Sequence, residues 1–220
     1  MIENQEMVNK ITELILEELE KYQESKRMIP VGISARHVHL AKRELEILFG
    51  KGHHLTVSKS LSQPAQFAAM ETVELIGPKG SLSKVRVLGP ERPETQVEVS
   101  LSDARKLGLK PPVRLSGNLK ESPGIRLKGP KGEVELEQGV IIAKRHLHLS
   151  VNEAKQFGLV EGDRIKVYVE GQRGGVMDEV VVRSGEGNAL DLHIDTDDAN
   201  AFGLVQGQLL RFEKIGNQKA

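Results

Sequence analysis

A strand–helix–glycine unit recurs four times along the chain, and such a repeat constrains the fold more than any single motif does. Each copy begins with a short β-prone run, continues into roughly one and a half turns of helix and ends at a glycine. The pattern predicts equivalent units packed around a pseudo-twofold axis. The four copies are "HVHLAKRELEILFG" (37–50), "QVEVSLSDARKLG" (96–108), "HLHLSVNEAKQFG" (146–158) and "DLHIDTDDANAFG" (191–203).

Residues that favour helix caps support the same units. Three of the predicted helices end at glycines suited to a positive φ, namely Gly108, Gly158 and Gly203. Polar residues that favour the N-cap fall near the helix starts, at Ser102, Asn152 and Thr196. Three copies continue into another β-prone run, so we predict that a strand follows each of these helices.

Short β-prone runs separated by Gly- and Pro-rich turns, such as "GPKG" at 77–80 and at 129–132, fill the chain after residue 30. Such spacing is typical of β-barrels and sandwiches with few helices. We predict a mainly β fold with short helices, in which small helices cap two pseudo-twofold-related β-barrel domains. The Gly-, Pro- and Lys-rich stretch 119–136 predicts the boundary, with domains over 30–125 and 126–215.

Residues 1–25 predict a separate N-terminal amphipathic helix, because apolar residues recur there at near-helical spacing between Glu and Lys. Two roles remain open for this segment. It packs on its own domain, or it docks onto a partner or protein shell as a targeting peptide. The amphipathic helix also favours a homo-oligomer, a dimer or a higher assembly.

The composition excludes several classes of protein. Lys+Arg and Asp+Glu both number 31, and aromatic residues make up 3%, so nothing favours nucleic acid or an anionic membrane. The chain has no cysteine, which excludes disulfides, thiolate metal ligands and a thiol nucleophile. No apolar run approaches the roughly 20 residues of a membrane span, and no secretory signal begins the chain. We expect a soluble, cytoplasmic protein.

The repeat places metal-ligand residue types at one equivalent position. Ten residues before the closing glycine stand Glu98, His148 and His193, and His39 lies eleven before Gly50. Residues i and i+2 of a strand share a face, so the preceding positions add more candidates. Gln96 and Asp191 also occupy these preceding positions. The candidate ligands are His37, His39, Glu98, His146, His148 and His193.

These six side chains suffice for two metal ions with about three protein ligands each. Three protein ligands leave an open position, which is the catalytic arrangement of zinc, and imidazole with carboxylate also suits iron, cobalt or nickel. Two such ions polarise carbonyl and phosphate oxygens, which favours an enzyme acting on acyl or phosphoryl substrates. The alternative is that the histidines are ordinary strand residues.

Arginines supply the positive charge that an anionic substrate needs. Arg92, six residues before Glu98, is the best-placed candidate, and Arg183 is a weaker one. Strand alternation turns Arg36 and Arg145 away from the ligand face, so we expect structural roles for them. No phosphate-binding loop, nucleophile elbow or dinucleotide fingerprint occurs in the chain.

The sequence resembles the PduL-type phosphotransacylases (phosphate propanoyltransferases) from about residue 30 to residue 212. The resemblance rests on specific motifs: "IPVGISARHVHL", "VRVLGPERPETQVEVSLSDARKLGLKPPVRLSG", "IIAKRHLHLS" and "LHIDTDDANAFG". It implies paired β-barrels with two Zn²⁺ ions and the interconversion of short-chain acyl-CoA (propanoyl-CoA or acetyl-CoA) plus phosphate with acyl phosphate plus CoA. Some members enter the lumen of a bacterial microcompartment, for example for propanediol degradation, through an N-terminal peptide.

By resemblance, the metal ligands are the same six residues, and Arg92 orients phosphate for direct attack on the thioester. Ser116 lies near the phosphate or the CoA thiol. Further substrate contacts come from Arg183, Gln63 and Gln96. The motif "SQPAQFAAM" departs from the family pattern, because Ala65 stands where glycine is expected.

Two other functions remain open. A dimetal hydrolase of thioesters or phosphoesters could use the same ligands and would release free acid without phosphate. A non-enzymatic module of a shell would hold its metals in closed coordination, and metal removal would unfold it. The sequence leaves the preferred acyl chain and the physiological direction open.

Overall fold

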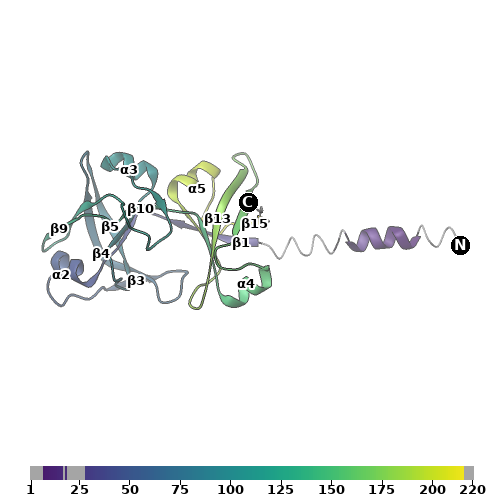
Figure 1. Ribbon diagram of the computed structural model, residues 1–220, viewed down its shortest axis with the longest axis horizontal. Helices are drawn as coiled ribbons and strands as arrows, with labels where there is room; N and C mark the ends of the chain where they lie inside the picture. Colours follow the sequence, from purple (N-terminus) through teal and green to yellow (C-terminus); the bar gives the residue numbers. More distant parts are fainter. Residues whose placement is uncertain (1–6, 17, 19–27, 216–220) are drawn as a thin grey trace.

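The computed structural model describes residues 7–16, 18 and 28–215 of the chain (Figure 1). Six strands close into a barrel in which each strand pairs with two neighbours. Around the barrel they follow the order β1 (Met28–Ser34), β14 (Asp191–Asp195), β11 (His146–Leu149), β13 (Gly175–Ser184), β12 (Arg164–Val169) and β15 (Leu209–Lys214).

The second sheet has nine strands and stays open. The main path runs through β7 (Val113–Arg114), β10 (Val140–Ala143), β6 (Gln96–Glu98), β2 (His37–His39), β5 (Ser81–Gly89), β4 (Phe67–Ile76), β8 (Ile125–Lys128) and β9 (Glu133–Leu136). Strand β3 (Val57–Ser60) pairs with β4 off this path. The two sheets form two adjacent lobes in Figure 1.

Six strands of the open sheet repeat the barrel in order and direction. The path β10–β6–β2–β5–β4–β8 has the same alternation of parallel and antiparallel pairs as β1–β14–β11–β13–β12–β15. In the barrel, β15 also pairs with β1 and closes the cylinder, whereas β8 and β10 do not form the equivalent pair. The predicted mainly β fold with two related β units is therefore confirmed, with one closed barrel and one open sheet.

Each sheet contains one strand that leads directly into the other sheet. β1 lies in the barrel and continues into β2 of the open sheet within residues 34–37. β10 lies in the open sheet and continues into β11 of the barrel within residues 143–146. The strands are thus divided differently from the predicted ranges 30–125 and 126–215, because β1 joins the barrel while β9 and β10 join the open sheet.

Four strands carry the candidate ligands, β2, β6, β11 and β14, and we call them the ligand strands. A short helix follows each of them: α2 (Lys42–Phe49), α3 (Leu101–Leu107), α4 (Val151–Phe157) and α5 (Thr196–Phe202). The glycines Gly108, Gly158 and Gly203 adopt the expected left-handed conformation, with φ between 66° and 79°. The predicted N-caps are wrong by one or two residues. The caps are Ser100, Ser150 and Asp195, whose side chains accept the third helical N–H.

Residues 7–16 form the N-terminal helix, and the rest of the predicted segment 1–25, apart from residue 18, lies outside the described residues. Apolar side chains of this helix are at least half exposed, including Met7, Val8, Ile11 and Leu14. No helix in the described part of the chain is long and apolar enough to cross a membrane.

The two "GPKG" turns form hydrogen bonds with the C-terminal ends of helices α3 and α2. Lys79 N–H donates to the carbonyl of Leu107 in α3, and Lys131 N–H donates to the carbonyl of Leu48 in α2, both at 3.0 Å. These hydrogen bonds satisfy helix-terminal carbonyls that have no partner inside the helix. The turns come this close because Gly77 and Gly129 have no side chain.

Replacing Gly77 or Gly129 by alanine should destabilise the fold. The added Cβ would lie 2.3 Å from the Leu107 carbonyl oxygen or 2.4 Å from that of Leu48, so a helix end must move. We expect a loss of about 1–3 kcal/mol in the free energy of unfolding, measured with urea. Gly185→Ala is the control, because its Cβ would meet nothing nearer than 3.6 Å. Equal stability of all three variants would contradict the steric role of these two glycines.

Candidate active site

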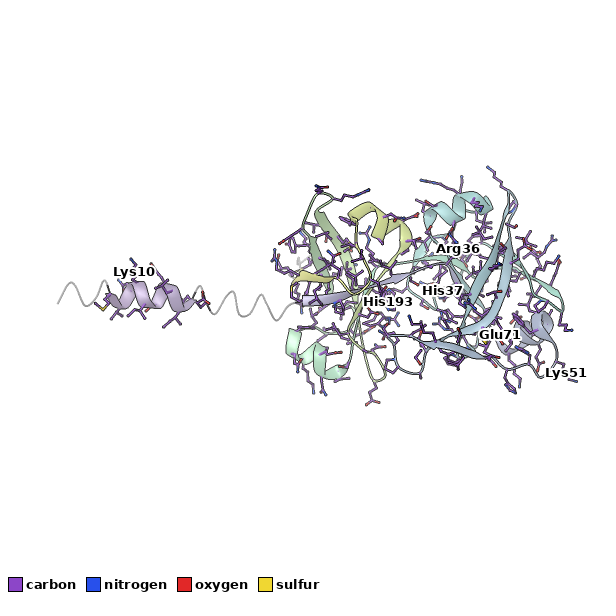
Figure 2. All side chains as sticks on the ribbon, turned by 180° about the vertical axis from the view of Figure 1, so that it is seen from behind. Lys10, Arg36, His37, Lys51, Glu71 and His193 are labelled. Atoms are coloured by element: carbon purple, nitrogen blue, oxygen red, sulfur yellow. The ribbon has the colours of Figure 1, made fainter. Side chains whose placement is uncertain are left out.

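Strand alternation separates the histidines from the hydrophobic cores. In β11, Leu147 and Leu149 are fully buried in the barrel core, while His146 and His148 point to the opposite face. In β2, Val38 is fully buried in the core of the open sheet between His37 and His39. Both HxH pairs directly follow a crossover segment, so they lie where the two sheets meet. Figure 2 places His37 and His193 near this junction.

The first ligand group comes from adjacent strands of the open sheet. β2 runs antiparallel to β6 with His37 opposite Glu98 and His39 opposite Gln96. The ligand atoms of His37, His39 and Glu98 lie within 4.8 Å of one another. His37 Nε2 is 3.5 Å from Glu98 Oε2. We call these three residues the first triad.

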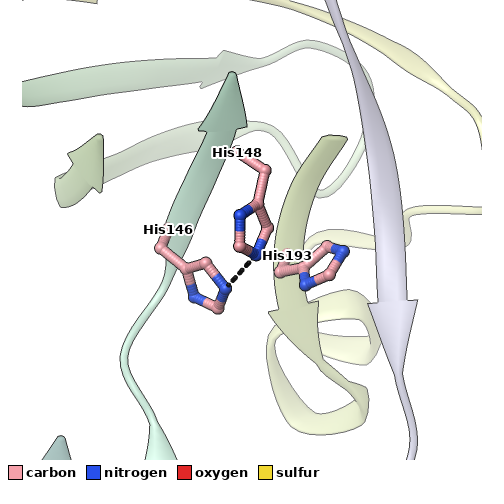
Figure 3. Close-up of side chains that lie close together, drawn as sticks. All are labelled: His146, His148 and His193. Atoms are coloured by element: carbon pink, nitrogen blue, oxygen red, sulfur yellow. Dashed lines mark hydrogen bonds between the residues drawn. The ribbon is translucent and has the colours of Figure 1, made fainter. Parts of the chain in front are cut away.

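The second triad repeats this register in the barrel. β11 runs antiparallel to β14 with His146 opposite His193 and His148 opposite Asp191. The ligand atoms of His146, His148 and His193 also lie within 4.8 Å of one another. The Nε2 atoms of His146 and His148 face each other at 3.0 Å (Figure 3). Two nitrogens bound to one tetrahedral zinc lie roughly 3.3 Å apart, so this spacing suits a shared ion.

Hydrogen bonds fix the leading histidine of each HxH pair. His37 Nδ1 donates to the Ala35 carbonyl at 2.9 Å, and His146 Nδ1 donates to the Lys144 carbonyl at 2.7 Å. In both residues Nε2 therefore keeps its lone pair for a metal. The second histidine of each pair differs, since Nδ1 of His39 and of His148 is buried without a hydrogen-bond partner among the described residues.

Burial keeps three of the imidazoles neutral. It lowers the pKa of His39 and of His148 to about 3 and that of His146 to about 4, with help from neighbouring histidines. Burial opposes ionisation of the His37–Glu98 pair, but the two side chains favour each other's charge. The pKa of Glu98 is therefore lowered and that of His37 raised. Neutral imidazoles and an ionised carboxylate are the forms that bind a divalent metal.

A cavity of about 740 Å³ opens onto both triads. The open sheet and its loops contribute Arg92 and Ser116 to the wall, and the barrel contributes Arg183. Burial lowers the pKa of Arg92 against the effect of Glu98, and the charge of Arg183 lowers it further, so the two guanidinium groups sense each other. Arg92 forms no ion pair with a carboxylate in the described part of the chain, whereas Arg183 lies 3.5 Å from Glu161.

The remaining predicted substrate contacts fall in two places. Gln63 lines the cavity, although its side-chain amide also bonds the backbone of Ala189 in both directions, at 2.9 and 3.1 Å. Gln96 does not line the cavity and lies behind Glu98, with 1% of its surface exposed. Cavity-lining residues that no sequence pattern had marked include Lys59, Gln66, Arg86 and Asn188.

Arg36 and Arg145 both form the expected structural ion pairs, although Arg36 also lines the cavity. Arg36 pairs with Asp103 of α3 at 2.7 Å, and Arg145 pairs with Asp198 of α5 through two bonds of 2.8 and 2.9 Å. Each aspartate is the third residue of its helix, so both crossover segments are tied to the helix that follows the neighbouring ligand strand.

Comparison with known proteins identifies the family of the chain. A family model of phosphate propanoyltransferases matches residues 30–205. The chain belongs to this family. It is 47% identical over 212 residues to the phosphate propanoyltransferase of Rhodobacter capsulatus, covering 96% of this chain and 99% of the relative. It is 52% identical over 164 residues to that of Thermotoga maritima, covering 74% and 78%.

A third relative is the phosphate propanoyltransferase of Salmonella typhimurium, which is 45% identical over 181 residues and covers 82% of this chain and 83% of its own. The resemblance found in the sequence motifs is thus confirmed, and the chain is an acyltransferase. Ala65, the position that departs from the family pattern, has a φ of 61°. Glycine adopts this left-handed conformation without the steric penalty that alanine meets.

Proposed function

We propose that this enzyme interconverts a short-chain acyl-CoA (propanoyl-CoA or acetyl-CoA) plus phosphate with acyl phosphate plus CoA. The observation that carries the proposal is the single cavity shared by two metal-ligand triads and two arginines. A phosphate needs the arginines, and a thioester carbonyl needs an electrophilic centre to accept its developing negative charge. Both requirements meet in one space between the two sheets.

We propose Zn²⁺ for both triads. Each triad offers three protein donors, two imidazoles with a carboxylate in the first and three imidazoles in the second, and both sets occur in catalytic zinc sites. Bound there, the ions would supply Lewis-acid stabilisation of negative charge on substrate oxygen and sulfur. The first triad carries one formal negative charge, on Glu98, and the second consists of histidines alone.

Arg92 and Arg183 hold the phosphate in this proposal. Their like charges share a partly buried wall, and an anion between them offsets both their repulsion and the cost of burial. A guanidinium also matches the geometry of phosphate oxygens through paired hydrogen bonds. The bound phosphate oxygen attacks the thioester carbonyl carbon, and the carbon–sulfur bond breaks to release CoA. No cysteine is present to form an acyl-thioester intermediate.

Ser116 adds a hydroxyl donor beside the arginine. Its Oγ accepts hydrogen bonds from Arg92 Nη1 and from Gln96 Nε2, both at 2.8 Å. Because both partners only donate, the hydroxyl proton of Ser116 is left to point elsewhere. We propose that it donates to a phosphate oxygen in the cavity, next to Arg92.

Product analysis separates this reaction from hydrolysis by the same ligand set. Purified enzyme given propanoyl-CoA should release CoA only when phosphate is present, with propanoyl phosphate appearing in equal amount. Removing metals with a chelator should abolish turnover, and added zinc should restore it. Release of free propanoate without phosphate would instead establish a hydrolase. Unfolding on metal removal, with no turnover of the untreated protein, would favour a non-enzymatic module whose fold depends on its metals.

Arg92→Ala should reduce turnover by roughly 10²–10³-fold, because it removes a charged group that holds phosphate in the transition state. Arg92 lies outside both triads, so the variant should retain the metal content of the wild-type enzyme. Arg105→Ala, at an exposed position of α3, is the control for loss of one positive charge. Full activity of Arg92→Ala would refute the phosphate role.

We propose that the helix over residues 7–16 docks this cytoplasmic enzyme onto the shell or cargo of a bacterial microcompartment. Its exposed apolar side chains support a docking role. Removing residues 1–25 should leave turnover unchanged and should abolish co-purification with shell proteins expressed together with the enzyme. Assembly of the full chain alone into a dimer that the truncated chain no longer forms would show that the helix serves homo-oligomerisation instead.

A further inference from the structure

Two buried polar residues occupy equivalent positions beside the triads, although only Asp191 also lines the cavity. Gln96 and Asp191 each stand two residues before the third ligand of a triad, Glu98 or His193. Their strands also set them directly opposite the second histidine of each HxH pair. Gln96 is 1% exposed and Asp191 is 4% exposed. The repeat therefore provides one supporting position per triad, and the two halves fill it with different chemistry.

Gln96 supplies a hydrogen-bond donor to a carboxylate ligand. Its Nε2 donates to Glu98 Oε1 at 2.5 Å, while Glu98 Oε2 faces His37. The amide itself is held in place, because its Oε1 accepts from Gly117 N–H at 2.8 Å and Nε2 also donates to Ser116. Every polar atom of the Gln96 side chain is thus hydrogen-bonded, and the side chain orients Glu98 toward the two histidines of the first triad.

Asp191 supplies an acceptor to an imidazole ligand. Its Oδ2 accepts from His193 Nε2 at 3.1 Å, which leaves the other ring nitrogen of His193 with its lone pair. The hydroxyl of Ser62, from the loop between β3 and β4, donates to the same oxygen. The carboxylate fits because Gly32 of β1 has no side chain, and a Cβ there would lie 2.6 Å from Asp191 Oδ1.

We propose that Gln96 and Asp191 are matched positioning residues, each holding the third metal ligand of one triad in its binding orientation. A carboxylate ligand takes a donor behind it, and an imidazole ligand takes an acceptor. This inference rests on the metal sites of the proposed function. It removes Gln96 from the substrate contacts and assigns it to the first triad.

The pairing also equalises charge between the two sites. The first triad contains the carboxylate of Glu98, and the second has a carboxylate one hydrogen bond away, at Asp191. Each divalent ion would therefore lie close to one negative charge. The two residues are not interchangeable, since a carboxylate at position 96 would face that of Glu98, and like charges at hydrogen-bonding distance repel.

Metal affinity tests the proposal independently of turnover. Gln96→Met removes the donor at nearly constant volume, and Asp191→Asn removes the negative charge. Each change is placed in two backgrounds, His148→Ala, which keeps only the first triad intact, and His39→Ala, which keeps only the second. Zinc affinity is measured by competition with a chelator, and the visible absorption of the Co²⁺ form reports the ligand geometry.

We expect each of the two changes to affect the zinc affinity of its own triad only. Gln96→Met should weaken zinc binding about 10–100-fold in the background that keeps the first triad. It should leave the zinc affinity unchanged in the background that keeps the second triad. Asp191→Asn should do the reverse, and each change should alter the Co²⁺ spectrum of its own triad only. Gly32→Ala, which displaces the Asp191 carboxylate without removing it, should act like Asp191→Asn.

Glu71→Gln is the matched control. Glu71 is a buried carboxylate that accepts from His53 Nε2 at 2.9 Å, outside both triads and separate from His193 (Figure 2). This variant should leave both affinities and both Co²⁺ spectra unchanged, even if it lowers stability.

Unchanged affinities for Gln96→Met and Asp191→Asn in backgrounds that bind zinc would overturn the positioning roles and leave the proposed metal centre intact. Equal weakening of both triads by either variant would also overturn them, because a general loss of stability would then explain the effect. If the wild-type protein and both backgrounds bind neither zinc nor Co²⁺, the proposed metal centre is wrong and the positioning roles are wrong with it.

Discussion

The exchange of β1 and β10 between the two sheets is the constraint on which the rest of the structure depends. Each strand pairs in parallel with a ligand strand of one sheet and then passes into the ligand strand of the other. The crossovers are only a few residues long, so both HxH pairs must begin at the junction. The ion pairs of Arg36 with Asp103 and of Arg145 with Asp198 hold these crossovers against the helices. Two triads facing one cavity are therefore a consequence of how the chain connects its sheets.

Around this symmetric frame, the chemistry is asymmetric. The register of β2 with β6 equals that of β11 with β14, yet the third ligand is a carboxylate in one triad and an imidazole in the other. The arginines also break the symmetry, because Arg92 comes from a loop of the open sheet and Arg183 from strand β13 of the barrel. A duplicated unit with identical sites would treat both ends of a substrate alike. The differences give the cavity two distinct chemical environments, as the proposed reaction of a phosphate with a thioester requires.

The sequence predicted those features that depend on local geometry. A strand followed by a short helix has a fixed length, so counting back from Gly108, Gly158 and Gly203 identified Glu98, His148 and His193 at one structural position. The same local pattern could not show that β1 belongs to the barrel, because parallel pairing with β14 joins residues about 160 positions apart along the chain. It also missed the clamp between Gln63 and Ala189, which forms only when the two sheets pack together. The N-caps were misplaced because several polar residues stand at each helix start, and only backbone geometry decides among them.

Stability and function compete in the cavity wall. Burying Arg92 near Arg183 costs free energy in the folded protein, since desolvation and like charge both disfavour the guanidinium. The buried Nδ1 atoms of His39 and His148, which lack hydrogen-bond partners among the described residues, add a further cost. Ordinary core residues at these positions would give a more stable junction. The unfavourable contacts concentrate where an anion and divalent ions would offset them, so the free energy that destabilises the junction would become available for the proposed binding of phosphate and metal.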